Sequence, residues 1–72
     1  MRPLAEPPSA AEMAVLRLLP SPGSWRDVAD ELFLSVHTVK SHARAIYRKL
    51  GVRTREEAVA HATALGLIGS SG

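Results

Sequence analysis

The sequence contains no cysteine and few aromatic residues, and these absences limit what the chain can be. Without cysteine, neither a disulfide framework nor a thiolate metal site can support the fold. Aromatic residues make up 4% of the 72 residues and hydrophobic residues 46%, so the core must be aliphatic and rich in alanine, as in closely packed helices. No apolar run approaches the roughly 20 residues that cross a bilayer, and no signal-peptide pattern is present. By elimination we expect one small, soluble, cytoplasmic domain.

The net charge of +2 conceals an uneven distribution of charge along the chain. Residues 35–55 include six cations and no carboxylate: Lys40, Arg44, Arg48, Lys49, Arg53 and Arg55. The other residues hold three cations against seven carboxylates, a net charge of −4. A positive field confined to one third of the chain favours a polyanionic partner. An acidic protein or an anionic membrane could use the same field, although membrane-bound basic helices usually carry large apolar side chains for insertion.

The stretch 35–51 has the pattern of an amphipathic helix. At about 100° per residue its apolar positions share one face: Val39, Ala43, Ile46 and Leu50. The opposite face carries His37, Ser41, Arg44 and Arg48, with Lys40 on its flank. We expect Ser35 to cap the first turn and Gly51 to end the helix. Such a helix could lie in a groove of duplex DNA, although a charged face opposite an apolar one is also typical of any surface helix.

Capping signals predict three further helices. Ser9 with Glu12 and Ser24 with Asp27 form capping-box signatures, and Thr54 precedes two glutamates that the helix dipole favours. The first helix should run from about residue 10 to 19, where prolines end it. The expected inward side chains are Val15, Leu16, Leu19, Val28, Ala29, Leu32, Ala58, Val59, Ala62 and Leu65. No strand pattern is present, so we expect an all-α, four-helix (tetrahelical) domain over residues 8–68, with a linker or tail at 1–7 and a flexible tail at 69–72.

The second and third helices, joined by the short turn 33–35, have the dimensions of a helix-turn-helix motif over about residues 25–44. In such a motif the second of the two helices enters the major groove. Arg44 could bind guanine in bidentate fashion, and Lys40 and Ser41 would contact bases beside it. Expected phosphate contacts lie near helix N-termini or along the exit of the third helix: Ser24, Trp25, Arg26, His37, Thr38, Arg48 and Lys49.

Several of these residues also have a structural interpretation. Trp25 could pack against the scaffold instead of reaching a phosphate, and Tyr47 should border the core with its hydroxyl free for a phosphate or a neighbouring helix. His42 is expected to be packed, and it diverges from His37 around the helix, so no metal site is indicated. The chain also lacks a nucleophile–base pair and a glycine-rich phosphate loop. We therefore expect no enzymatic activity and no cofactor.

The chain resembles the C-terminal DNA-binding domain of LuxR-type regulators, the four-helix module also found in NarL/FixJ-type response regulators. The resemblance covers nearly the whole of residues 8–68. Its most specific part is the pattern Thr38-Val39-Lys40…His42 followed by Lys49-Leu50-Gly51-Val52. It also includes Glu12, Val15 to Leu19, Val28-Ala29, Leu32, Ser35, Ile46 to Arg48, Arg55, Ala58-Val59 and Gly66-Leu67.

This resemblance implies the output domain of a bacterial transcription regulator that binds duplex DNA sequence-specifically through its third helix. The base-reading positions fall on Lys40, Ser41 and Arg44, and Arg26 and Thr38 would contact phosphates. The fourth helix commonly forms the dimer contact, here through the small exposed positions Ala60, His61 and Ala64, and RNA polymerase is a possible further partner. The alternative is a protein-interaction module that pairs with a regulatory partner or RNA polymerase.

Two departures from the family pattern are present. Pro8 replaces a usual leucine before the first cap, and two prolines lie between the first two helices. The chain is either excised from a larger regulator, in which case residues 3–8 would suit a severed linker, or a free-standing output domain.

Overall fold

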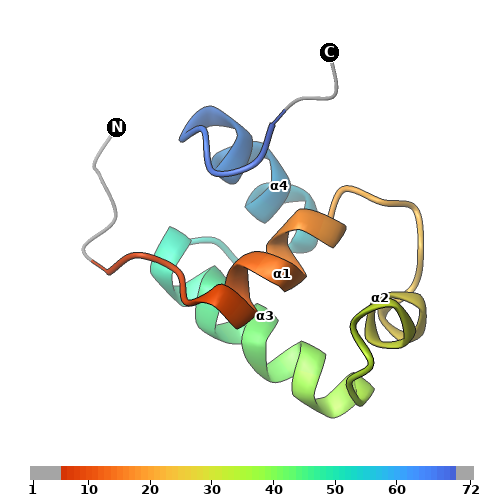
Figure 1. Cartoon of the computed structure of the whole chain (residues 1–72). Helices are drawn as coiled ribbons and strands as arrows, with labels where there is room; N and C mark the ends of the chain where they lie inside the picture. Colours follow the sequence, from red (N-terminus) through yellow and green to blue (C-terminus); the bar gives the residue numbers. More distant parts are fainter. Residues whose placement is uncertain (1–5, 70–72) are drawn as a thin grey trace.

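The computed structural model describes residues 6–69, and in this range the chain forms four α-helices and no strand (Figure 1). The helices are α1 (Ala10–Leu18), α2 (Trp25–Leu32), α3 (Val36–Leu50) and α4 (Arg55–Ala64). The all-α, four-helix prediction is therefore confirmed. Residues 1–5 of the predicted N-terminal tail and 70–72 of the predicted C-terminal tail lie outside the described residues.

Each helix begins at the cap that the sequence predicts. The hydroxyls of Ser9, Ser24 and Thr54 accept hydrogen bonds from backbone N–H groups three residues later, and the acids at those positions accept from the cap backbone. Ser35 accepts from the Thr38 N–H at 3.1 Å. These bonds satisfy N–H groups that have no partner within a helix, and they fix where each helix starts.

Three of the helices are followed by the same backbone closure. The N–H groups of Leu34, Val52 and Leu67 return to carbonyls five residues earlier, at 2.9, 3.0 and 2.9 Å. Such a turn requires a left-handed residue, and glycine supplies it at Gly51 (φ 73°) and Gly66 (φ 76°). After α2, Phe33 adopts φ 59° although it has a side chain, and that side chain is 95% exposed.

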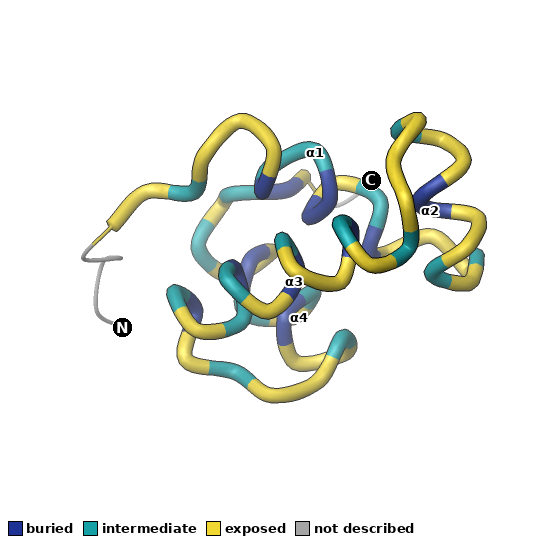
Figure 2. The backbone as a smooth tube through the Cα atoms, turned by 90° about the horizontal axis from the view of Figure 1, so that it is seen from below, coloured by how far each residue is buried: buried dark blue, intermediate teal, exposed yellow. Residues whose placement is uncertain are grey.

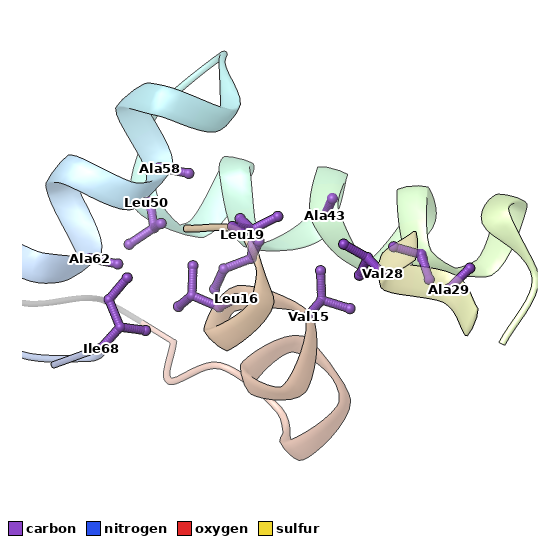
Figure 3. Close-up of a cluster of buried hydrophobic side chains, with 12 residues drawn as sticks. Val15, Leu16, Leu19, Val28, Ala29, Ala43, Leu50, Ala58, Ala62 and Ile68 are labelled. Carbon is purple, nitrogen blue, oxygen red and sulfur yellow. The ribbon is translucent and has the colours of Figure 1, made fainter. Parts of the chain in front are cut away.

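The core lies between α3 and the other helices. Val39, Ala43, Ile46 and Leu50 of α3 are all buried, as predicted. Figure 3 shows the side chains from α1, α2 and α4 that gather with them: Val15, Leu16, Leu19, Val28, Ala29, Ala58 and Ala62, together with Ile68. Leu32, Val59 and Leu65 are half-buried at the edge of this cluster. Alanine at the buried positions of α4 lets that helix approach its neighbours closely.

Candidate nucleic-acid interface

The face of α3 opposite the core is exposed and positively charged. His37, Lys40, Ser41, Arg44 and Arg48 are all exposed, and at about 100° per residue they fall within a sector of about 100°. Figure 2 shows exposed stretches along α3 alternating with the buried ones. Within the described residues no carboxylate forms a salt bridge with Lys40, Arg44 or Arg48. The candidate base contacts therefore lie on one accessible surface, which we call the cationic face and define by these five residues.

Lys49 does not join the cationic face, although it follows Arg48 in the sequence. Its ammonium lies 2.7 Å from Oε1 of Glu12 and donates to the Pro7 carbonyl at 3.3 Å. Only 13% of the Lys49 side chain and 10% of the Glu12 side chain are exposed. The helical repeat turns Lys49 about 100° away from Arg48, toward α1. This ion pair argues against the expectation that Lys49 contacts phosphate, because Glu12 already neutralises its charge.

The carboxylate of Glu12 is held in its charged form. It accepts the hydrogen bond from Lys49 and a second one, at 2.9 Å, from the backbone N–H of Ser9. Chiefly because of the Lys49 hydrogen bond, the pKa of Glu12 lies below its ordinary value of 4.5. The sequence identified Glu12 only as a capping residue. Its spacing to Val15, Leu16 and Leu19 places it on the core-facing side of α1, and this signal could have revealed its burial.

The N-terminus of α2 presents the other candidate phosphate contacts. Ser24 is exposed and caps the helix, with its hydroxyl hydrogen-bonded to the Asp27 carboxylate at 3.2 Å. Arg26 is exposed and forms a salt bridge of 3.5 Å with Asp30. A surface pair of this kind contributes little stability, so Arg26 can leave it for a stronger anion. Thr38, at the start of α3, is half-buried, and its hydroxyl accepts a hydrogen bond from the Ser35 hydroxyl at 2.9 Å.

Trp25 packs against the protein, in agreement with its structural interpretation. Its ring is half-buried at the edge of the core, and the guanidinium carbon of Arg55 lies 5.2 Å from the ring centroid, within cation–π range. The same guanidinium donates from Nε to the Leu19 carbonyl and from Nη2 to the Ser21 carbonyl, both at 2.9 Å. From the sequence alone, Arg55 has no assigned contact and counts only as one of the cations of residues 35–55. The only signal was indirect: the last carbonyls of a helix need donors from elsewhere.

Tyr47 borders the core, as expected, but its hydroxyl is buried and has no hydrogen-bond partner among the described residues. Burial raises the pKa of Tyr47 above its ordinary value of 10.0. Since the hydroxyl is not exposed, this arrangement supports a packing role for the ring.

The outward side of α4 carries small side chains. Ala60 and Ala64 are exposed and His61 is half-buried. A shallow depression on one side of α4 is lined by Gly51, Val52, Glu57, Ala60, His61 and Ala64. A mostly apolar one on the other side is lined by Leu19, Pro20, Ser21, Arg55, Glu56, Val59 and Ala60. The three residues predicted for a dimer contact therefore lie together on an accessible surface.

Two further features are absent from the described residues. No group of three or more histidine, aspartate or glutamate side chains is placed to hold a metal ion. None of the described helices is long and apolar enough to span a membrane.

Comparison with known proteins links this geometry to a family. Residues 8–62 match the family model described as "Bacterial regulatory proteins, luxR family". The structure is similar to that of the response regulator ChrA of a heme-sensing two-component system, with a TM-score of 0.84 and 40% sequence identity over 93% of this chain and 33% of that one. It is also similar to the transcription factor GerE, with a TM-score of 0.77 and 30% identity over 85% of this chain and 91% of that one. The chain thus spans about a third of the length of ChrA.

Proposed function

The chain belongs to the luxR family of bacterial regulatory proteins, a family of DNA-binding transcription regulators, and we propose that it binds duplex DNA sequence-specifically with α3 in the major groove. The cationic face is the observation that supports this proposal. It is accessible, it lies opposite the buried stripe, and its three cations lack carboxylate partners among the described residues. A major groove admits one α-helix, so a single exposed helical face suffices to read bases.

Base recognition is assigned to Lys40, Ser41 and Arg44. The planar guanidinium of Arg44 can donate two parallel hydrogen bonds to O6 and N7 of guanine. Lys40 can donate to the same acceptors with less geometric discrimination. Ser41 is short enough to let the helix approach the base edges closely. All three are exposed and lie in the N-terminal half or middle of α3.

Phosphate contacts are assigned to residues on both sides of this reading surface. Ser24 and Arg26 at the start of α2, His37 and Thr38 at the start of α3, and Arg48 near its end would hold the two backbone strands. Helix N-termini favour anions because their backbone N–H groups and macrodipole point outward. Lys49 is omitted because Glu12 neutralises it, and Trp25 is assigned a packing role.

The biological context follows from the same family. We propose that residues 8–68 form the output domain of a regulator that acts in the cytoplasm, with the helix-turn-helix motif at about 25–44. Two copies would pair through Ala60, His61 and Ala64 of α4, so that the DNA target contains two inverted half-sites about one helical turn apart. RNA polymerase is a further proposed partner of the DNA-bound domain.

Selection from a random duplex pool, followed by a salt titration, tests the proposal. A bound sequence should be recovered, and the logarithm of its affinity should fall linearly with the logarithm of the salt concentration, with a slope of about −0.9 for each phosphate contacted. A random duplex should bind more weakly with a similar dependence on salt. Enrichment of no sequence would contradict sequence-specific recognition. Absence of salt-dependent binding to any duplex would contradict DNA binding and favour the protein-interaction alternative.

A further inference from the structure

Arg55 is placed where a helix disfavours a cation. It is the first residue of α4, and the N-terminal end of a helix carries partial positive charge. Its side chain nevertheless contacts other parts of the protein: two of its nitrogens donate hydrogen bonds, and its guanidinium carbon lies 5.2 Å from the centroid of the Trp25 ring. Such a placement indicates that the contacts of Arg55, rather than its charge alone, explain its position.

These contacts join three parts of the chain at one point. The two carbonyls that accept from Arg55 belong to Leu19 and Ser21, in the segment that follows α1. The aromatic ring belongs to Trp25, the first residue of α2. Pro20 and Pro22 in that segment have no N–H to donate, so it makes few backbone bonds of its own. Arg55 therefore supplies two of the hydrogen bonds that order the approach to α2.

The tryptophan links Arg55 to the proposed DNA contacts. Trp25 stands between Ser24 and Arg26, the two phosphate contacts assigned to α2. α2 packs on α1 and α3, and α4 packs on α3, so the cation–π contact of Arg55 with Trp25 adds a link from α4 to the start of α2. A shift of this start would move the Ser24 hydroxyl, the Arg26 guanidinium and the first amides of α2 together.

We propose that Arg55 is a positioning residue for DNA binding, which holds the N-terminal end of α2 in place for the phosphate backbone without touching DNA. The inference rests on the proposed function. A lysine cannot replace Arg55, because it offers one compact ammonium instead of a planar fork that donates to two carbonyls while its guanidinium lies within cation–π range of the ring. Because Arg55 belongs to α4, the proposed dimer helix also positions the N-terminal end of α2.

The test combines a double-substitution cycle with a charge-matched control, in the 72-residue chain and on random duplex. Arg55→Met and Arg26→Met should each weaken binding by about fivefold at 0.15 M salt, the effect of losing about one phosphate contact. The double variant should lose less than the product of the two, because the Arg26 contact is one of those that Arg55 positions. Arg55→Lys should behave like Arg55→Met. Arg17→Met, which removes an exposed cation of α1, should bind like the wild-type chain.

The fluorescence of the tryptophan provides a second test that does not depend on DNA. Trp25 is the only tryptophan, so its fluorescence reports this site alone. Arg55→Met and Arg55→Lys should make it more accessible to acrylamide quenching, while far-UV circular dichroism confirms that the helices persist. Unchanged quenching would overturn the link between Arg55 and α2.

The outcomes separate this inference from the function on which it rests. Wild-type affinity in Arg55→Lys would show that charge alone matters and would overturn the positioning role. Losses that multiply in the double variant would also overturn it, since Arg55 would then act independently of Arg26. A wild-type chain that binds no duplex in a salt-dependent way would contradict the proposed function itself.

Discussion

The ammonium of Lys49 lies 2.7 Å from the carboxylate of Glu12, and this ion pair fastens the last turn of α3 to the first turn of α1. The same ammonium reaches the Pro7 carbonyl, so the segment that precedes α1 is held at the same point. Both charged groups are nearly buried, and each satisfies the other. The pair places the beginning of the chain relative to the helix proposed to read DNA.

Removing one member of this pair should destabilise the fold strongly. Lys49→Met leaves the Glu12 carboxylate buried without its cation and should lower the free energy of unfolding by about 3 kcal/mol. Chemical denaturation followed by circular dichroism measures this change. Arg48→Met, at the exposed neighbouring position, should change stability by less than about 0.5 kcal/mol. Equal effects of the two substitutions would show that the pair has no special structural role.

The same pair predicts how stability depends on pH. The pKa of Glu12 is lower in the folded chain than its ordinary value of 4.5, so the unfolded state binds more protons in this range. The stabilisation is therefore complete above that ordinary value and is lost as the pH falls through the lowered pKa of the folded state. Glu12→Gln should flatten this decline in a series of denaturation curves between neutral and acidic pH. A decline of unchanged steepness would exclude Glu12 as its source.

Phe33 should be replaceable by glycine with a gain in stability. The residue has φ 59° and is 95% exposed, so it bears the cost of a left-handed backbone and contributes little packing. Phe33→Gly should raise the free energy of unfolding by about 1 kcal/mol, the cost of that conformation for a residue with a Cβ. Gly51→Ala is the matched opposite case, because it adds a Cβ at a left-handed residue. No atom lies within 4 Å of the added Cβ, so any loss of stability would come from backbone strain and not from a steric clash. A loss of stability in Phe33→Gly would show that the aromatic ring makes a stabilising contact.

Arg44 and Arg26 should differ in how they affect specificity. Arg44→Ala should reduce affinity for the selected duplex by about 1–3 kcal/mol and relax the preference at one base pair. Arg26→Ala should weaken selected and random duplexes alike, since a phosphate carries no sequence information. Binding curves on both duplexes measure the difference. Equal losses on the two duplexes for Arg44→Ala would count against base recognition by this residue.

Pairing through α4 can be tested separately from DNA contact. Ala60 is exposed on the proposed dimer surface, and Ala60→Glu would place a carboxylate in each copy against the other. We expect the variant to keep its affinity for a single half-site and to lose the cooperative binding of a second copy to a two-half-site duplex. Sedimentation of the complexes gives the number of copies bound. Ala11→Glu, at an exposed position of α1, adds the same charge as a control and should bind as two copies.

Local signals in the sequence predicted much of the fold and the cationic face. Ser9, Ser24, Ser35 and Thr54 start the four helices where expected, because a cap depends on groups within three residues of each other. The buried stripe of α3 follows from the helical repeat alone, and the exposure of Lys40, Ser41 and Arg44 follows from being outside that stripe. The left-handed conformation of Phe33 could not be predicted from the sequence, because such a turn usually has glycine at this position.

Which cations lack a partner depends on how the helices pack. In the sequence, Lys49 and Arg55 do not differ from the other basic residues of the segment 35–55. The partner of Lys49 is Glu12, 37 residues away. The partners of Arg55 are the carbonyls of Leu19 and Ser21, 36 and 34 residues away. The repeat of a helix fixes the direction of a side chain, but it does not specify which element crosses the helix at that side or which carbonyls and carboxylates that element presents. Local sequence signals therefore specify the helices, their caps and the cationic face, whereas the packing of α1 and α4 against α3 specifies which charges remain available to a partner.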